Sequence, residues 1–439
     1  MTLSRRAFLG STGLAGLAIA STRAPGAPRP HAAQDPLPLL DRPSGAPEAV
    51  AADEAYWRRV AAYYRVSDRF TNLEAGYFGM MAAPVLAAYH RHIDRVNLES
   101  SFYARRGFPA DVEAARGRVA AFLGAKPTEV AFTRGATEAL QCLIAQYKGV
   151  GAGDQVMYAD LDYNAMQFAM NWLAERRGAT VARLEIPEPA SRDNVLAAYA
   201  KALDANPRVK LLLLTHLNNK TGLVIPVKEI AAMARARGAD VVVDAAHSFG
   251  QVSLTLEDLG ADFVGCNLHK WIGAPVGVGA MYIREERLAD IDRELNDEGA
   301  AASILSRVHS GTANFATFLT VPAALDFHES VGPAYKAARL RYLRNRWVAA
   351  VRGTAGIDVL TPDDPGMAAA ISSFRIRGRT GRAENQAVSS ELFDTYQLFT
   401  FWRTGLARGD CVLVTPALYN TPADCDRLAA ALKSIAIRG

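Results

Sequence analysis

The chain has 439 residues, of which 50% are hydrophobic and 21% are charged, and this balance excludes a disordered or fibrous protein. The formal net charge is +4, and the first 33 residues supply the whole excess through Arg5, Arg6, Arg23 and Arg29. The rest of the chain is therefore neutral and offers no basic surface for nucleic acid or for an anionic membrane. Its length favours two domains.

The N-terminal segment has the layout of an export signal. The pair Arg5-Arg6 precedes a weakly hydrophobic stretch, Ala7–Ala20, whose 14 residues are fewer than the roughly 20 that a helix needs to span a bilayer. The segment resembles a twin-arginine signal over residues 1–33, cleaved after Ala33. We therefore expect transport to the periplasm by the twin-arginine translocase and no stable membrane insertion. An uncleaved, disordered tail is the alternative.

After this signal the sequence predicts three further parts. Residues 34–70 are rich in Pro and Gly at their start and are expected to form an arm or linker. Residues 71–325 are predicted to form a large domain, and residues 326–439 a smaller one.

The four cysteines are widely spaced and form no Cys-x-x-Cys pair. A metal site built on cysteine is therefore not expected, and the sequence indicates no other metal site. We expect buried free thiols rather than a disulfide, because free cysteine behaves as a small hydrophobic residue. These cysteines are Cys142, Cys266, Cys411 and Cys425.

From Thr71 onward, short runs of β-forming residues alternate with longer segments of helical period. The predicted strands are 130–133, 155–159, 180–185, 210–215, 240–244, 263–267 and 280–284. The predicted helices between them are 137–148, 165–177, 194–205 and 228–237. This alternation predicts an α/β fold with a mainly parallel, doubly wound sheet. Leu211–Leu214 and Val241–Val243 fit central strands that are buried on both faces.

The pattern changes after Ala323. A long helix rich in arginine is followed by predicted strands at 371–376 and 411–414 and by a closing helix at 422–437. These elements predict a smaller α+β domain at the C-terminus.

Ligands of doubly wound sheets bind beyond the carboxyl ends of the strands. After the strand 130–133, the sequence Arg134-Gly135-Ala136-Thr137-Glu138 opens a helix. Gly135 permits a close approach of the backbone, and the free amides with the Thr137 hydroxyl suit a phosphate group. A helix that is merely capped at this point is the alternative.

Two other strand ends carry ionisable residues. Asp244 follows Val241–Val243, where a carboxylate can pair with a protonated ring nitrogen. Lys270 follows the strand 263–267, and a lysine in a partly desolvated pocket has a lowered pKa and can form a Schiff base with an aldehyde. Taken singly, each has an ordinary alternative: a structural aspartate or metal ligand, and a solvated surface lysine.

These residues also occur in one order along the chain, together with Asp162-Tyr163 and with His216-Leu217-Asn218-Asn219. From about Thr71 to the C-terminus the sequence resembles the class V aminotransferases. These are pyridoxal-phosphate enzymes of fold type I, and the group includes cysteine desulfurases and isopenicillin N epimerase-like proteins. The segments that carry the resemblance are Gly135-Ala136-Thr137-Glu138, Val243-Asp244-Ala245-Ala246-His247, Ala261-Asp262-Phe263, His269-Lys270-Trp271 and Tyr419-Asn420-Thr421.

The resemblance implies that the large domain binds pyridoxal 5'-phosphate. Lys270 would hold this cofactor through a Schiff base and then move the Cα proton of the substrate. Asp244 would keep the pyridine nitrogen protonated, so that the ring withdraws electrons strongly. Tyr163 would stack on the ring. Asn219 and His247 would reach the side of the ring that carries the phenolic oxygen.

The resemblance also implies a phosphate site and a homodimer. Ala136, Thr137 and His269 would hold the phosphate, and Asn267 stands where relatives often have serine. Ser310-Gly311-Thr312 matches a segment that crosses to the other subunit's phosphate, so Thr312 implies active sites shared between two subunits.

The sequence departs from the family at the substrate carboxylate. Epimerase-like relatives usually have an arginine where this chain has Leu413. Arg403 and Arg105 are the candidates to replace it, together with Arg375 and Arg377; a substrate amine without an adjacent free carboxylate is the other explanation. The Arg-x-Gly-His-His-Cys-like motif of the desulfurases is absent.

We therefore expect an exported enzyme that acts on the amino group of an amino acid or of a peptide-derived substrate. Amino transfer and epimerisation are the favoured reactions, in the tailoring of a secreted peptide or siderophore. One alternative is an enzyme similar to C–S lyases or desulfurases. The other is a periplasmic protein that binds the cofactor and is catalytically silent.

Overall fold

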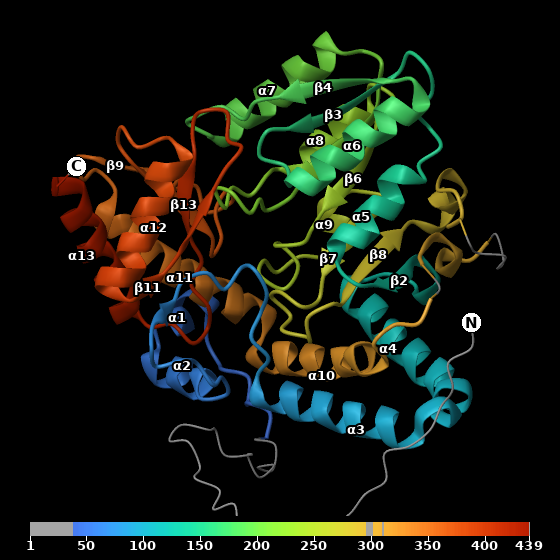
Figure 1. Cartoon of the computed structure of the whole chain (residues 1–439), viewed down its shortest axis with the longest axis horizontal. Coiled ribbons are helices and arrows are strands. Elements are labelled where there is room, and N and C mark those ends of the chain that lie inside the picture. The colour runs from blue at the N-terminus through green and yellow to red at the C-terminus, as the bar shows by residue number, and fades with distance from the viewer. Residues whose placement is uncertain (1–37, 296–301, 310, 439) are drawn as a thin grey trace, which may run out of the picture. The chain divides into compact units, whose positions relative to one another are not determined.

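The continuous apolar runs Leu211–Leu214 and Val241–Val243 form the centre of a seven-stranded sheet (Figure 1). The structure is a computed structural model that describes residues 38–295, 302–309 and 311–438. The strands of this sheet are β2 (Val130–Thr133), β3 (Gln155–Ala159), β4 (Thr180–Leu184), β5 (Val209–Thr215), β6 (Asp240–Asp244), β7 (Phe263–Asn267) and β8 (Gly279–Ile283). Their order is β2-β8-β7-β6-β5-β3-β4. Strand β8 runs in the opposite direction to the other six strands of this sheet.

Helices cover both faces of the sheet. Neighbouring side chains of a strand point to opposite faces, and in the central strands both sets are apolar, so each face needs a cover. Leu211 and Leu213 of β5 pack with the helices α5 and α6. Leu212 and Leu214 pack with the helices α4, α7, α8 and α10 on the other face. The bounds of these helices are α4 (Phe108–Leu123), α5 (Ala136–Ala145), α6 (Asn164–Arg177), α7 (Arg192–Ala205), α8 (Val227–Arg235) and α10 (Phe315–Val331). The predicted doubly wound α/β fold is therefore confirmed.

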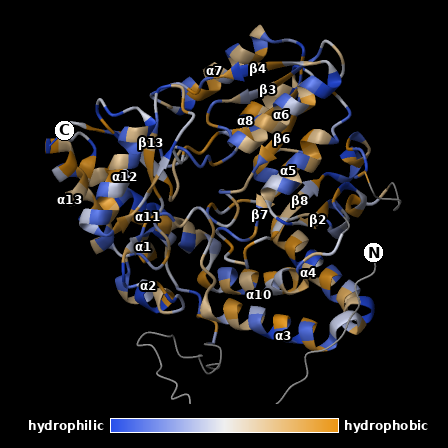
Figure 2. Ribbon diagram, viewed as in Figure 1, coloured by the Kyte–Doolittle hydropathy of each residue, from blue (hydrophilic) through white to orange (hydrophobic). Residues whose placement is uncertain are grey.

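Two further helices complete this region. The short α9 (Leu256–Leu259) precedes β7, and the long α3 (Ala83–Arg106) packs along α10 (Figure 1). Figure 2 shows apolar and polar residues alternating along the helices, as expected for elements with one face toward a core and one toward water. Three short 3-10 helices lie at Pro127–Glu129, Glu285–Asp290 and Ile304–Arg307.

The C-terminal region has its own sheet and core. Its antiparallel strands are β9 (Ile357–Val359), β10 (Ser372–Ile376), β12 (Phe401–Arg403) and β13 (Cys411–Val414), in the order β12-β13-β10-β9. The helices α11 (Pro333–Val351), α12 (Arg382–Tyr396) and α13 (Pro422–Arg438) supply a separate apolar cluster. The expected boundary at residues 325 and 326 falls inside α10, and the division into two domains stays a prediction.

The segment expected to be an arm contains two helices, α1 (Pro47–Ala51) and α2 (Glu54–Ala61). Trp57 is buried and donates to the Val50 carbonyl at 2.7 Å, and Glu54 pairs with the buried Arg339 of α11. After these helices, β1 (Thr71–Asn72) pairs with β11 (Leu398–Phe399). The apolar residues Trp57 and Val60 on one side of α2 belong to the main apolar cluster, which explains why this segment folds against the rest of the chain.

The remaining expectations from composition can be compared with the described residues. All four cysteines are buried free thiols, as predicted. Within the described ranges there is no helix of sufficient length and apolar character to cross a membrane, and no group of three or more His, Cys, Asp or Glu side chains that could hold a metal ion.

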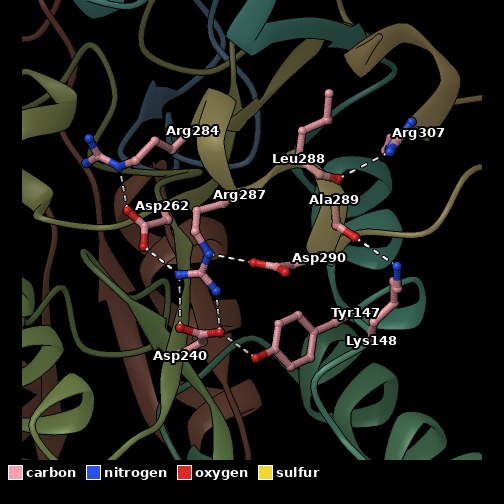
Figure 3. Close-up of polar contacts among 10 residues, drawn as sticks. All are labelled: Tyr147, Lys148, Asp240, Asp262, Arg284, Arg287, Leu288, Ala289, Asp290 and Arg307. Carbon is pink, nitrogen blue, oxygen red and sulfur yellow. Dashed lines mark hydrogen bonds and ion pairs between the residues drawn. The ribbon is translucent and has the colours of Figure 1, made fainter. Parts of the chain in front are cut away.

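The amino-terminal edge of the parallel strands is held by a network of charges (Figure 3). Asp240 begins β6 and Asp262 precedes β7, and Arg287 bonds to both carboxylates, at 2.6 and 2.9 Å. Tyr147 donates to Asp240, and Arg284 pairs with Asp262 at 2.6 Å. One guanidinium thus ties the beginnings of two central strands to the chain that follows β8.

Replacing Arg287 with methionine should lower the free energy of unfolding by about 2 kcal/mol, because Asp240 and Asp262 would keep their charges without the guanidinium. Urea unfolding followed by circular dichroism measures the change. Arg377→Met is the matched control, since Arg377 forms an exposed ion pair with Asp358, and exposed pairs add little to stability. Equal stability of the two variants would contradict a structural role for the network.

Candidate active site

The carboxyl ends of the parallel strands open into a cavity of about 600 Å³. Most residues predicted for the site line it. They are Gly135, Ala136 and Thr137 beyond β2, Tyr163 beyond β3, Asn219 beyond β5, Asp244 and His247 at and beyond the end of β6, and Asn267, His269 and Lys270 at and beyond the end of β7. Residues from five strands therefore meet at one edge of the sheet, as the strand-end rule predicts.

Arg403, Arg105 and Thr312, also predicted for the site, lie in three different places. Arg403 of β12 also lines the cavity. Arg105 is exposed in the last turn of α3, and Thr312 lines a different hollow, so neither belongs to this lining. Ser310 and the signal at residues 1–33 lie outside the described residues, and the shared dimer site stays a prediction.

Lys270 lies in the turn that follows β7. Burial lowers the pKa of its amine to about 8, Arg403 acts in the same direction, and Asp244 and Glu74 oppose the shift. Its Nζ atom lies 2.7 Å from Nε2 of His247. A lysine with this pKa is partly uncharged near neutral pH and can act as a nucleophile or a base.

His247 is buried beside this lysine. Desolvation, followed by the charges of Lys270 and Arg403, lowers the pKa of His247 well below its usual value, so the imidazole is neutral. Its Nδ1 atom is buried and has no hydrogen-bond partner among the described residues. The ring is therefore able to bond both to Lys270 and to a ligand.

Asp244 is the last residue of β6 and is 3% exposed. Burial raises the pKa of its carboxyl, while the Ala246 amide, which donates at 2.8 Å, and the charge of Lys270 lower it. A cation that pairs with a buried carboxylate favours the ionised form. Asp244 is thus suited to a protonated ring nitrogen.

The N-terminus of α5 forms the predicted phosphate seat. The Asn267 side chain accepts from the Ala136 amide at 2.7 Å, so this asparagine fixes the first turn of the helix. A Cβ atom on Gly135 would lie 3.1 Å from that Asn267 oxygen and 3.3 Å from the His269 ring, so the backbone comes close here because residue 135 is glycine. The remaining amides of the first helical turn suit an anion.

His269 completes this seat, and Glu138 lies beside it. Glu138 lines the cavity, and its carboxylate is occupied by the backbone amide and the guanidinium of Arg134. His269 donates from Nδ1 to the Val278 carbonyl at 2.8 Å, which leaves Nε2 for a ligand. Burial lowers the pKa of His269, and a bound dianion would oppose that shift.

Tyr163 is the N-cap residue of α6, and Asp162 determines where it lies. The buried Asp162 carboxylate accepts from the amides of Ala159 at 2.7 Å and Thr215 at 2.9 Å. These two amides belong to the ends of β3 and β5, so Asp162 joins the strands on either side of the loop. Tyr163 is 40% exposed and presents its ring at the cavity.

The lining fits a flat phosphorylated ring that carries an oxygen and a basic nitrogen. Buried polar atoms without partners in the described part of the chain include Asn219 Oδ1 and His247 Nδ1, and both residues line the cavity. Such groups are costly unless a ligand bonds to them. With Asp244 at one wall and the α5 amides at another, the donor set matches pyridoxal phosphate.

Glu74 was not predicted as a site residue, although it is bonded to Arg403. The Arg403 guanidinium pairs with the buried Glu74 carboxylate and donates from Nε to the Asn219 carbonyl at 2.9 Å. Its Nη1 atom has no hydrogen bond to any described residue. Arg403 therefore has a fixed position and one free edge. Glu74 lies beside β1 and belongs to no motif, so no pattern in the sequence points to it.

The glycines of Gly76-Tyr77-Phe78-Gly79 were also missed. The Gly79 amide donates to the His269 carbonyl at 2.8 Å, and a Cβ atom on Gly79 would lie 1.8 Å from the Lys270 carbonyl oxygen. A Cβ atom on Gly76 would lie 3.4 Å from the His247 ring. Two glycines three residues apart were a usable signal, since glycine often marks a close approach of backbones.

The other candidates for a carboxylate site are occupied elsewhere. Arg375 pairs with Glu188 at 2.7 Å, and Arg377 pairs with Asp358 at 2.9 Å. Leu413 is fully buried in β13. Among the candidates considered, Arg403 is the one that the structure places in the cavity.

Comparison with known proteins agrees with this geometry. Isopenicillin N epimerase from Amycolatopsis lactamdurans is 29% identical over 406 residues, which cover 86% of this chain and 98% of the relative. The cysteine desulfurase of Thermococcus onnurineus NA1 superposes with a TM-score of 0.75 at 20% identity, over 87% of this chain and 98% of that one, and shows the fold.

A further structure bears on the cofactor. In a variant of C-DES, glycine is covalently linked to the PLP cofactor, and this protein superposes with a TM-score of 0.73 at 20% identity over 83% of the present chain and 97% of its own. The model of the family "Aminotransferase class-V" matches residues 84–391. This chain therefore belongs to the class V aminotransferase family and is a pyridoxal-phosphate enzyme.

Proposed function

We propose that the chain moves the Cα proton of an amino-acid or peptide-derived amine, in amino transfer or epimerisation, with Lys270 as the base. The observation that carries this proposal is the 2.7 Å contact between Lys270 Nζ and the neutral His247 ring inside the strand-end cavity. A base that takes up and returns a proton near neutral pH needs a pKa close to that pH. Burial brings the pKa of Lys270 to about 8.

The neighbouring residues support this chemistry. Bound pyridoxal phosphate supplies an electron sink for the pair of electrons that the proton leaves behind. Asp244 would provide a buried negative charge for the ring nitrogen, and the amides beyond Ala136, whose own amide is bonded to Asn267, would hold the phosphate end. Tyr163 would cover the ring. His247 orients the Lys270 amine through their hydrogen bond.

Arg403 supports a substrate with a carboxylate. Glu74 and the Asn219 carbonyl fix two sides of its guanidinium, and the free Nη1 edge remains for a ligand. Because Glu74 already neutralises part of the positive charge, Arg403 should bind a carboxylate more weakly than an unpaired arginine would. Weak binding of the carboxylate suits larger substrates, including peptide amines, because other parts of such a substrate provide most of its contacts.

A desulfurase reaction through a cysteine nucleophile receives no support from the described residues. All four cysteines are buried, and none lines the cavity. Burial raises the pKa of Cys411, the nearest in sequence to Arg403, to about 12, which opposes a reactive thiolate. C–S lyase chemistry that uses Lys270 alone is the alternative outcome of the tests below.

Periplasmic action is part of the proposal. It is supported by the Arg5-Arg6 pair and by the weakly hydrophobic stretch that follows it. Twin-arginine export carries folded chains, which agrees with an enzyme that must acquire its cofactor before it leaves the cytoplasm. The tailoring of a secreted peptide or siderophore would then take place outside the cytoplasm.

Replacing Lys270 with alanine should reduce Cα proton exchange by at least about a thousandfold, because the base is lost. Exchange from deuterated water into a panel of D- and L-amino acids and peptide amines, followed by NMR, measures this effect, and Lys201→Ala on the exposed face of α7 is the control. Inverted stereocentres indicate epimerisation, keto products indicate amino transfer, and pyruvate with sulfide from cysteine indicates C–S lyase chemistry. No exchange by the unaltered protein would indicate a catalytically silent binding protein.

Replacing Arg403 with methionine should raise KM about tenfold or more for substrates with a free α-carboxylate, since a charge-assisted hydrogen bond is lost. KM for the matching carboxamides should change little. Arg403→Lys keeps the charge beside Glu74 and tests whether loss of folding explains the result. Arg408→Met alters an exposed arginine in the loop that follows β12 and is the control. Equal KM changes for acids and amides would place the carboxylate elsewhere.

Replacing Arg5 and Arg6 together with lysine should keep the chain in the cytoplasm while its charge is unchanged. Fractionation of a bacterium that has the twin-arginine translocase, followed by immunoblotting, measures the distribution. Arg23→Lys is the matched control within the same segment. Periplasmic recovery of the double variant at the normal level would contradict this export route.

A further inference from the structure

A second lysine is buried behind the catalytic turn. Lys336 lies in the first turns of α11 and is 6% exposed. Its amine donates to the carbonyl oxygen of Trp271, the residue directly after Lys270, and lies 3.3 Å from Nδ1 of His328 in α10. The lysine therefore joins two helices to the turn that carries the reacting amine.

The surroundings of Lys336 disfavour a full positive charge. A cavity of about 40 Å³ lies between the two lysines, and its described lining contains the titratable groups of Tyr64, His328 and Tyr419 besides Lys270, but no carboxylate. Burial lowers the pKa of His328 well below its usual value, so no ionised partner comes from that side either. The amine also lies near the positive end of α11. Lys336 thus acts mainly as a hydrogen-bond donor.

The backbone of the Lys270 turn is held at successive carbonyl groups. The Leu268 carbonyl accepts from the Ala274 amide at 3.1 Å, and the His269 carbonyl accepts from the Gly79 amide at 2.8 Å. The Lys270 carbonyl packs against the bare face of Gly79. The next carbonyl along the chain is that of Trp271. Among the described residues, it accepts its hydrogen bond from the Lys336 side chain.

We propose that Lys336 is a positioning residue for Lys270. By fixing the Trp271 carbonyl from α11, it sets the direction in which the Lys270 side chain enters the cavity and keeps its amine against His247. This inference rests on the proposed function of Lys270. A purely structural role is the competing explanation, and Arg344 provides the comparison: it is a buried cation on the same helix whose guanidinium bonds to the Pro362 carbonyl, away from the catalytic turn.

The test measures covalent capture of pyridoxal phosphate by the full mature chain after its cofactor has been removed with hydroxylamine. The rate is followed by visible absorbance from pH 6 to pH 9.5, and borohydride reduction with peptide mass spectrometry identifies the lysine. In the unaltered protein the rate should rise with pH and level off above about pH 8, because the uncharged amine is the nucleophile and burial sets its pKa near 8.

Lys336→Met removes the donor at nearly constant length. It should slow capture about tenfold or more, since a small misplacement of a reacting group is costly. It should also move the midpoint of the pH profile upward, because a Lys270 side chain released toward water regains part of its usual pKa. Lys336→Gln keeps an N–H donor and should stay within about threefold of the normal rate, with an unchanged midpoint.

Arg344→Met controls for lost stability, which urea unfolding measures for every variant. A normal rate and midpoint in Lys336→Met, or equal slowing in Arg344→Met, would overturn the inference. If Lys336→Met does not fold, the capture rate of Lys336→Asn takes its place in the test, since the asparagine amide is too short to reach the Trp271 carbonyl. Equal rates for the Asn and Gln variants would also overturn it. Failure of the unaltered chain to capture the cofactor at Lys270 would instead contradict the proposed function.

Discussion

The site depends on keeping one amine out of water without giving it a strong ionic partner. Burial lowers the pKa of Lys270 to about 8, and a carboxylate in direct contact would undo that effect. The structure meets this condition with a neutral imidazole as the nearest polar group and with Asp244 and Glu74 as the opposing charges. The tight turn after β7, the glycine at position 79 and the carbonyl bonds around it all serve to hold that arrangement.

Much of the fold could be predicted, because strands buried on both faces show as continuous apolar runs. The expected bounds of β2, β3, β6, β7 and β13 agree with the structure. The segment at residues 34–70 was harder, since its Pro/Gly-rich beginning concealed α1 and α2. Those helices are short, and most of their stability comes from contacts such as Trp57 with Val50, which local composition does not reveal.

Some residues of the candidate site could likewise be predicted from the sequence, and others could not. Residues at strand ends, including Asp244 and Lys270, could be found because the sheet topology brings strand ends together. Glu74 could not, since its partner Arg403 lies 329 residues away in sequence. Thr215 shows an intermediate case: it ends β5 in the expected place, but a lone hydroxyl gives no chemical signal until the residue is found in the cavity lining.

Strand β6 carries an aspartate at each end, and the two have unrelated tasks. Asp240 belongs to the charge network around Arg287, and Asp244 faces the cofactor cavity. Four residue steps along a strand span about 13 Å, which exceeds the roughly 8 Å over which physiological salt screens exposed charges. The strand is thus an electrostatic spacer. A change of charge at the anchoring edge should therefore act little on the ionisation of Asp244, so heat tolerance can be engineered at one end of the sheet without retuning the chemistry at the other.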